Sequence, residues 1–167
     1  MQTFLPYPDF EESAKALDTK RLGKQRVEAM QLLDALRIRQ DWEPLAPAQI
    51  RNHPACLMWR NYETVLYYYG IKVCEVWRGQ GHVDNVVHKL VRMRLPFGTA
   101  RTPWWYGLKE YHKSHRISLL WKDFNFYKKI FCSTEEQDVA QSYLRTGRTF
   151  RTWWPTEHLQ EKERGNS

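Results

Sequence analysis

The sequence predicts an all-α fold, a compact single-domain helical bundle that begins with an N-terminal arm. Two observations lead to this prediction: apolar residues recur at helical spacing in several long segments, and proline-rich stretches separate these segments. The chain has 167 residues, of which 42% are hydrophobic, so it is long and apolar enough to bury one core. We assign residues 1–155 to this domain and residues 156–167 to a polar tail that is expected to fray.

The N-terminal third is predicted to contain an arm and two helices. Residues 1–8 carry two prolines and predict an extended arm. Asp9, with Glu12 three residues later, matches a capping box at the start of the first helix. A long helix follows over residues 18–38, because its apolar residues recur at helical spacing. These apolar residues are Leu22, Ala29, Leu33 and Leu36.

The middle of the chain is predicted to form a loop and then a long helix. Residues 41–50 contain two prolines and predict the loop. Pro54 suits the first turn of a helix over residues 55–69, whose apolar residues cover a wide arc. Residues 71–78 continue the same pattern, with a bend expected at Gly70, and the glycines that follow are expected to end the helix.

The C-terminal half is predicted to contain three further helices and a less regular segment. The helices are expected at residues 83–91, 108–121 and 124–131. Residues 96–103 have a proline at each end and are expected to form a loop. Residues 143–154 are rich in strand formers around a glycine, which is typical of a hairpin or a loose extension.

The charge balance and the aromatic content favour a polyanionic partner. The chain contains 26 Lys and Arg against 19 Asp and Glu, which makes a net charge of +7, and it also contains eight tryptophans. Basic side chains neutralise phosphates and flat rings stack on bases, so a nucleic acid fits this composition. The alternative interpretation is a tryptophan-rich core beneath a charged surface.

Several classes of protein are excluded by missing motifs. The sequence has no P-loop, no Rossmann glycine pattern, no GxSxG and no HExxH, which argues against NTP hydrolysis, dinucleotide redox chemistry, serine hydrolysis and zincin chemistry. The three cysteines form neither a CxxC pattern nor a disulfide framework. Because neither a signal peptide nor a membrane-spanning apolar run is evident, we expect a cytoplasmic protein without a membrane partner.

The first candidate site lies on the predicted helix over residues 18–38. Arg21, Lys24, Gln25 and Glu28 fall at spacings of three, four and seven residues and share one helix face. A lone carboxylate among cations is expected to have a lowered pKa and to stay ionised. It would then stabilise a developing cation or act as a base toward water, while the cations hold phosphates. The alternative is a solvated helix face with a Lys24–Glu28 ion pair.

The second candidate site lies on the predicted helix over residues 108–121. His112 and His115 are about one helical turn apart, a spacing that can bind a metal, but no third ligand is evident nearby. His115, Ser118 and Lys122 are instead expected to share a face that suits a phosphate. The alternative is a half-buried histidine that bonds a neighbouring loop.

Two further clusters carry residues suited to nucleic-acid contact. His53 lies at a predicted helix start, where backbone amides favour anions, and Arg60 follows on the same helix. The alternative for His53 is plain helix capping. Trp104, Trp105 and Tyr106 are adjacent rings that cannot all face one core. One of these aromatics is therefore expected to stack on a base or to fill the gap left by a flipped nucleotide.

These motifs resemble those of a known family over about residues 3–155. The segment LDTKRLGKQRVE, residues 17–28, is similar to the N-terminal helix of the pyrimidine-dimer DNA glycosylases of the endonuclease V type. Family members carry a basic residue, a Leu and, seven positions after the basic residue, a Glu, and these correspond here to Arg21, Leu22 and Glu28. Similarity to bacterial members lies in PWW at 103–105, YHKSH at 111–115, LLWKD at 119–123 and WP at 154–155.

The resemblance implies a fold and a reaction. The fold is an all-α bundle of the endonuclease V type that bends DNA strongly and extrudes a nucleotide. The N-terminal α-amine attacks C1′ of the damaged nucleoside, a Schiff base forms, and β-elimination cuts the strand. Glu28 is expected to support the cationic sugar and the later proton transfers, without a metal or another cofactor. Because Gln2 is too large for ordinary removal of the initiator methionine, the amine is expected to belong to Met1.

We therefore expect a DNA base-excision enzyme, a glycosylase with or without AP-lyase activity, that flips and removes a damaged or modified pyrimidine from double-stranded DNA. The expected catalytic residues are Glu28 and Met1, and no metal, cofactor or obligate protein partner is expected. Three alternatives stay open: a glycosylase that uses water activated by Glu28, a non-catalytic module that recognises bent or damaged DNA, and an enzyme that processes nucleotides or nucleosides. The residues expected to contact DNA are Arg21, Lys24, Arg26, His53, Arg60, Trp104, Trp105, His112, His115, Arg116 and Lys122.

Overall fold

The computed structural model describes residues 2–36, 51–93 and 100–155 of the chain. These ranges contain no strand, so the predicted all-α fold is confirmed. None of the helices within them is both long and apolar enough to cross a membrane. The helices are α1 (Phe10–Lys15), α2 (Thr19–Leu36), α4 (Pro54–Trp59), α5 (Glu63–Gly79), α6 (Val87–Arg92), α7 (Lys109–Lys122), α8 (Phe124–Tyr127) and α9 (Thr134–Thr146).

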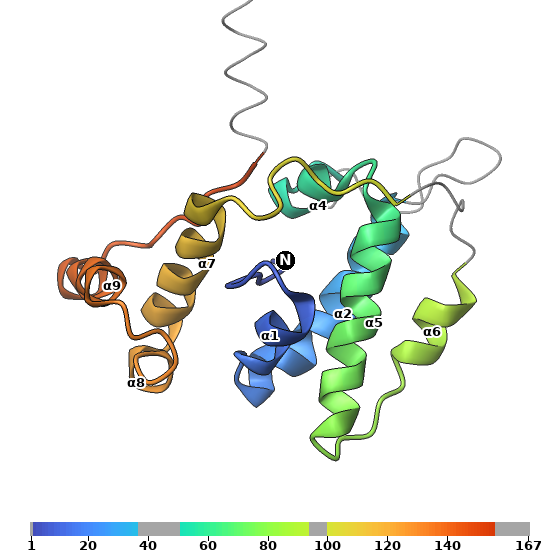
Figure 1. Cartoon of the computed structure of the whole chain (residues 1–167), viewed down its shortest axis with the longest axis horizontal. Helices are drawn as coiled ribbons and strands as arrows, with labels where there is room; N and C mark the ends of the chain where they lie inside the picture. Colours follow the sequence, from blue (N-terminus) through green and yellow to red (C-terminus); the bar gives the residue numbers. More distant parts are fainter. Residues whose placement is uncertain (1, 37–50, 94–99, 156–167) are drawn as a thin grey trace, which may run out of the picture.

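The helices form two groups, and the N-terminal segment lies between them (Figure 1). In one group α2 packs against α5, with α1, α4 and α6 packed against this pair. In the other group α7 packs against both α8 and α9. The described part of the arm lies near the centre of the view and leads from there into α1. The predicted arm is therefore an internal element and not an extension into solvent.

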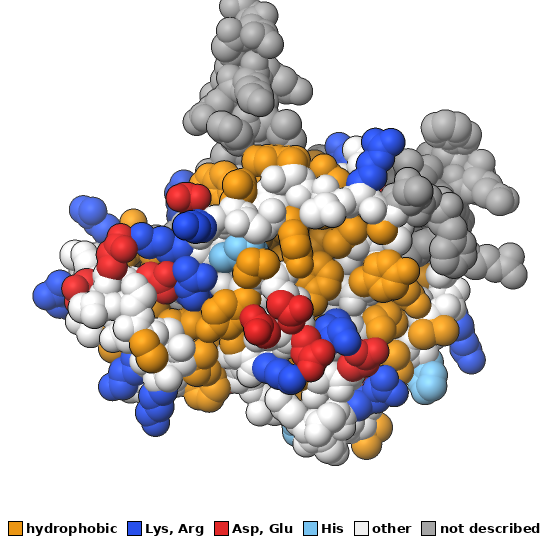
Figure 2. All heavy atoms as spheres, viewed as in Figure 1, with side chains coloured by type: hydrophobic (Ala, Val, Ile, Leu, Met, Phe, Trp, Pro, Cys, Tyr) orange, Lys and Arg blue, Asp and Glu red, His pale blue; other side chains and the backbone are white. Residues whose placement is uncertain are grey.

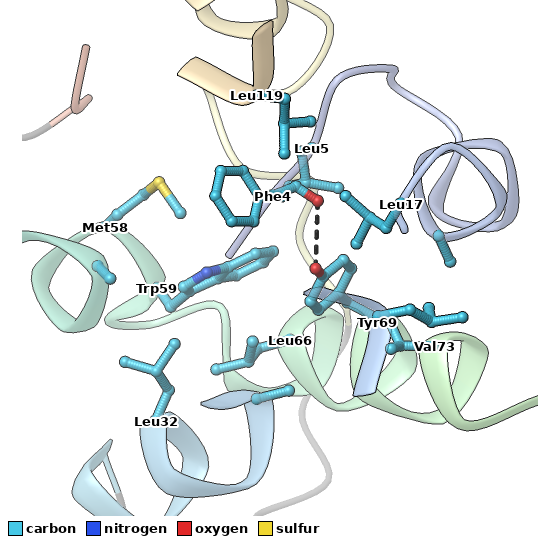
Figure 3. Packing of buried hydrophobic residues seen from close by; sticks show 14 of the residues in the cluster. Phe4, Leu5, Leu17, Leu32, Met58, Trp59, Leu66, Tyr69, Val73 and Leu119 are labelled. Carbon is cyan, nitrogen blue, oxygen red and sulfur yellow. Dashed lines mark hydrogen bonds between the residues drawn. The ribbon is translucent and has the colours of Figure 1, made fainter. Parts of the chain in front are cut away.

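The arm is held by the hydrophobic core (Figure 3). Phe4 and Leu5 have exposed fractions of 5% and 0%, and they lie among Trp59, Tyr69 and Leu119. The Tyr69 hydroxyl oxygen lies 3.2 Å from the Phe4 carbonyl oxygen. Full burial of a large apolar side chain stabilises a protein by roughly 1.5–3 kcal/mol, so these side chains offset much of the entropy lost when the arm becomes ordered.

The first two helices start where the sequence predicts. The Glu12 N–H donates to Asp9 Oδ1 at 2.8 Å, which confirms Asp9 as the N-cap of α1. At the start of α2, the Arg21 N–H donates to Asp18 Oδ1 at 2.9 Å. A short polar side chain before each helix thus satisfies an amide that has no partner within the helix. The predicted end of the second helix lies outside the described residues, as do residues 41–50.

The predicted helix over residues 55–69 is wrong, because the chain breaks between α4 and α5. Asn61 has a φ of 69°, a left-handed conformation that interrupts a right-handed helix and that Asn adopts more readily than most residues. The Asn61 N–H donates to Glu63 Oε1 at 3.0 Å, so the new helix begins with a local hydrogen bond. Beyond this break α5 continues to Gly79, in agreement with the pattern over residues 71–78.

Gly70 lies inside α5 and serves close packing. A Cβ atom at this position would lie 3.3 Å from the Cβ of Ala29 on α2 and 3.3 Å from Cδ1 of Leu90 on α6. Both distances are shorter than ordinary van der Waals contacts. The absence of a side chain therefore lets α5 approach two neighbours at the same point, which a one-dimensional pattern does not reveal.

The hairpin or extension predicted for residues 143–154 is wrong in its first part. Residues 134–146 form α9, which Ser133 caps and which ends at Gly147, where φ is 65°. Gly adopts this left-handed conformation without steric cost, as is common after a helix C-terminus. The helix predicted at 108–121 is confirmed as α7, whereas α6 and α8 are shorter than predicted. The tail and residues 94–99 lie outside the described part of the chain.

Candidate active site

A pocket of about 570 Å³ opens beside the face of α2 that carries Glu28. The first turns of α2 form one wall and the C-terminal end of α7 contributes another, while the arm and the end of α9 complete the lining. Four cationic side chains surround one carboxylate at this place. The lining residues are Gln2, Phe4, Lys20, Arg21, Lys24, Gln25, Glu28, Trp121, Lys122 and Leu144.

Glu28 is held by a hydrogen bond from its own helix, and the same donor group also bonds the arm. The Glu28 Oε2 accepts from Gln25 Nε2 at 2.8 Å, and Gln25 Nε2 also donates to the Gln2 carbonyl at 2.8 Å. Burial raises the pKa of Glu28 above its ordinary value, and the positive charge of Lys24 and the hydrogen bond from Gln25 offset the increase only in part. The lowered pKa expected from the neighbouring cations is therefore wrong, because burial outweighs their charge. A carboxylate with a raised pKa is a better proton acceptor than a surface carboxylate.

The predicted cations Arg21, Lys24 and Lys122 meet at this pocket although they come from two helices. Asp18 accepts a hydrogen bond from Arg21 Nη1 at 2.5 Å, which fixes the guanidinium at the edge of α2. Burial and the positive charges of Arg21 and Lys24 lower the pKa of Lys122, while Glu28 acts in the opposite direction. Lys122 of α7 lines the same pocket as Arg21 and Lys24 of α2, so the two helices present their charges to the same space.

The surface outside this pocket has a mixed charge. Figure 2 shows acidic side chains gathered over α1 and the neighbouring part of α5. Glu11 pairs there with Lys15 at 2.6 Å, and Glu75 pairs with Lys72 at 2.7 Å. The net positive charge of the chain is thus not spread evenly, and this face is a poor surface for a polyanion.

The polar groups of the arm backbone are satisfied by the histidines of α7. The Leu5 N–H donates to His115 Nδ1 at 3.3 Å, and the Leu5 carbonyl lies 2.8 Å from His112 Nδ1. The exposed fractions of His112 and His115 are 3% and 0%. Their expected contact with DNA is therefore corrected: both side chains are internal and bond the arm, because a lone extended segment needs side-chain partners for its backbone. The alternative interpretation, a half-buried histidine that bonds a neighbouring loop, agrees better with this arrangement.

Arg116 also holds the arm. Its guanidinium donates to the Pro6 carbonyl at 2.7 Å and makes a two-pronged contact with Glu136 of α9, with hydrogen bonds of 2.7–3.0 Å. Glu136 has an exposed fraction of only 5%. The donors of Arg116 are thus directed to the protein interior, and the expected DNA contact is corrected to a structural contact that joins α7, α9 and the arm.

Arg26 and Trp105 are likewise internal, so their expected DNA contacts are corrected. Arg26 Nη1 donates to Asp84 Oδ1 at 2.5 Å, and its guanidinium lies 4.2 Å from the ring centre of Trp77. Trp105 has no exposed surface, its Nε1 donates to the Met58 carbonyl at 3.3 Å, and it serves the core. A side chain enclosed by the protein has no surface to offer to DNA in this conformation.

The other predicted contact residues lie apart from the pocket. His53 is the N-cap of α4, where its Nδ1 accepts from the Ala55 N–H at 3.1 Å, in agreement with the capping alternative. Arg60 is exposed just after α4, and Trp104 is 41% exposed. These three residues are not among those that line the pocket. Met1 lies outside the described residues.

Sequence reasoning missed several lining residues. Lys20 precedes Lys24 by one helical turn, so the spacing rule applied to α2 finds it. Trp121 directly precedes Lys122 in the sequence. The Lys122 Nζ lies 5.2 Å from the centre of the Trp121 ring. Leu144 could not be found, because it lies on the unpredicted helix α9 and is brought to the pocket by the packing of α9 against α7.

The buried histidines predict a loss of stability in mild acid. Burial lowers the pKa of His115 from 6.5 to about 3 and also lowers the pKa of His112. Between these pH values the unfolded chain binds a proton that the folded chain does not, so the free energy of unfolding should fall as the pH falls from 6.5 toward 3. Urea unfolding at several pH values measures this slope.

The variant His115→Gln keeps an acceptor for the arm but cannot be charged, so its stability should depend less on pH over this range. The exposed His88 provides the control, and His88→Gln should retain the full slope. Equal slopes in His115→Gln and the unsubstituted protein would contradict the role of His115.

Fold and site together define an all-helical protein with a basic pocket built around one carboxylate. A family model described as pyrimidine dimer DNA glycosylase matches residues 1–90, and the chain belongs to this family. The matched region contains Arg21, Lys24 and Glu28, whereas Lys122 lies beyond it. No curated protein and no solved structure matches the chain. Because the family is one of DNA glycosylases, membership indicates an enzyme that acts on DNA.

Proposed function

We propose that this protein excises a damaged or modified pyrimidine from double-stranded DNA, with Glu28 as the catalytic carboxylate and the α-amine of Met1 as the nucleophile. The observation that carries the proposal is the pair of hydrogen bonds by which Gln25 Nε2 joins the Gln2 carbonyl to the Glu28 carboxylate at the wall of a cationic pocket. The proposed nucleophile is the amine of the residue that directly precedes Gln2 in the sequence.

The proposed reaction begins with attack of the neutral amine on C1′ of the nucleoside. The glycosidic C–N bond breaks, and the base leaves with the bonding electrons and takes up the proton that the attacking amine loses. The C1′–O4′ bond then opens to an iminium while O4′ is protonated. Removal of a C2′ proton by Glu28 breaks the C3′–O bond and expels the 3′ phosphate. An α-amine suits the first step because its ordinary pKa, near 8, leaves a neutral fraction at neutral pH.

The pocket also suits the substrate. Its volume of about 570 Å³ lies within the range of small-molecule sites and exceeds what one nucleotide requires. We assign Lys20, Lys24 and Lys122 to the phosphates on either side of the extruded nucleotide. Trp121 and Leu144 supply an apolar wall for the base, because a flat ring or a methyl group can contact any pyrimidine without hydrogen bonding.

Borohydride trapping tests the function directly. The protein is mixed with DNA duplexes that carry a cyclobutane pyrimidine dimer, an abasic site or one of several modified pyrimidines, and the cross-linked peptide is identified by mass spectrometry. An adduct on the N-terminal peptide supports the imine mechanism and identifies the substrate. Release of base without an adduct would instead indicate that the protein is a glycosylase that uses water activated by Glu28. If no duplex gives an adduct and none releases a base, the proposed enzyme activity is contradicted.

The cations of α2 predict a defined salt dependence of DNA binding. Lys24→Gln should weaken binding about equally for all duplex sequences, and it should lower the slope of log affinity against log salt by about one, because one phosphate contact is lost. Fluorescence anisotropy titrations over a range of salt concentrations measure this slope. Lys129 is exposed and does not line the pocket, so Lys129→Gln is the matched control. An unchanged slope in Lys24→Gln would remove Lys24 from the DNA contact.

A further inference from the structure

Gln25 connects three parts of the protein through one buried side chain. It lies on α2 with an exposed fraction of 1%. Its Oε1 accepts from the Phe4 N–H at 2.9 Å and from the Tyr69 hydroxyl at 2.7 Å. Its Nε2 donates to the Gln2 carbonyl at 2.8 Å and to Glu28 Oε2 at 2.8 Å. The arm, the core and the carboxylate thus meet at a single amide group.

The four hydrogen bonds leave the amide only one orientation. A glutamine side chain offers two donor hydrogens and two acceptor lone pairs, and all of them are used here. If the amide were rotated by half a turn, Oε1 would face the Gln2 carbonyl and the Glu28 carboxylate, while the NH₂ group would face the Phe4 N–H. Acceptors would then oppose acceptors and donors would oppose donors, at the full cost of buried, unpaired polar groups.

The same network fixes the distance between the arm and Glu28. The Nε2 group donates to both the Gln2 carbonyl and the Glu28 carboxylate, so one donor group spans the arm and the carboxylate. Residues 2 and 4 of the arm are therefore tied to the α2 turn that carries Glu28. A shift of the arm along its own direction would break at least two of these bonds.

We propose that Gln25 is a positioning residue, which holds the N-terminal arm and the Glu28 carboxylate in the relative geometry that the reaction requires. This inference rests on the proposed function, because it gives a purpose to the placement of the arm beside Glu28. Catalytic groups must be held within a fraction of an ångström of the productive geometry, and a misplacement of about 1 Å can lower the rate about 100-fold.

The variant Gln25→Glu tests the inference through the pH profile of base release. The new carboxylate retains the acceptor of Gln25 but loses both donors and places a second acid against Glu28. Two close carboxylates cannot both ionise easily, so the pair should hold a proton to higher pH than Glu28 alone. We expect single-turnover base release to fall about 100-fold at neutral pH and the acid limb of its pH profile to move to higher pH. An unshifted limb with an unchanged rate would overturn the proposal.

Gln137 offers a matched control. Like Gln25, it donates two hydrogen bonds from Nε2. Its acceptors are the backbone carbonyls of Lys128 at 3.2 Å and Phe131 at 2.8 Å, and it does not line the pocket. Gln137→Glu should therefore lower thermal stability without a shift in the pH profile. If both variants moved the profile equally, the effect of Gln25→Glu would be a general loss of structure and the proposal would fall.

A nuclear magnetic resonance titration of the unsubstituted protein needs neither a substrate nor a stable Gln25 variant. The side-chain NH₂ protons of Gln25 should change their chemical shift as Glu28 ionises, and this response should disappear in Glu28→Gln. An absent response would overturn the connection between Gln25 and Glu28. A clear response with no base release from any DNA would instead point to failure of the proposed function alone.

Discussion

Glu28→Gln is expected to lower the single-turnover rate of base release by about 10²–10⁴-fold, the range that general acid–base groups contribute. The substitution removes the proton acceptor and the negative charge but keeps nearly the same shape. Its amide oxygen can still accept from Gln25 Nε2, which bonds the carboxylate in the present structure. DNA affinity should be nearly unchanged, because the four cations that line the pocket remain.

The measurement pairs base release under enzyme excess with an anisotropy titration on the same duplex. Glu110 is exposed on α7 and does not line the pocket, so Glu110→Gln is the control for the loss of one negative charge. Full activity in a folded Glu28→Gln protein would refute the assignment of Glu28. A cooperative thermal transition near that of the unsubstituted protein shows whether the variant is folded.

Asp84→Asn should lower the free energy of unfolding by about 3–5 kcal/mol, the usual cost of removing one partner from a buried ion pair. The Asp84 side chain is 0% exposed and that of Arg26 is 10% exposed, so water can do little to solvate the Arg26 charge once the carboxylate is lost. The guanidinium of Arg26 would remain buried against Trp77 without a counter-charge. Equilibrium urea unfolding measures the change.

Asp138 is exposed on α9, and Asp138→Asn should change stability by no more than about 0.5 kcal/mol. The double variant Asp84→Asn with Arg26→Met removes both charges and should recover much of the lost stability, because no unpaired charge remains. If Asp84→Asn were as stable as Asp138→Asn, the ion pair between Arg26 and Asp84 would not contribute substantially to the free energy of unfolding.

The fold could be predicted from the sequence mainly where local signals are strong. Asp9 caps α1 as expected, and α7 agrees with the predicted segment to within one residue at each end. The break at Asn61 and the close approach at Gly70 could not be predicted, because each depends on a backbone conformation or a neighbour from another helix. The assignment of residues 1–155 to one domain stays a prediction.

Only the part of the candidate site that lies on α2 was predicted as one cluster, whereas Lys122 was predicted as a DNA contact on a different helix. Arg21, Lys24 and Glu28 share a face of α2 because helical spacing places them there. The histidines of α7 follow a similar spacing, yet the face on which they lie is turned toward the arm. Spacing identifies which residues lie together on a helix but not which face of the helix meets solvent.

By itself the sequence determined the class of the fold, the face of α2 that carries Glu28 and the resemblance to the family, because helix periodicity and short motifs are properties of neighbouring residues. Only the tertiary structure decided that Lys122 and Leu144 join this face, that the arm is buried, and that Gln25 bonds Glu28. It also decided that burial outweighs the cations in setting the pKa of Glu28. Burial and contacts between distant segments arise from packing, which no local pattern contains.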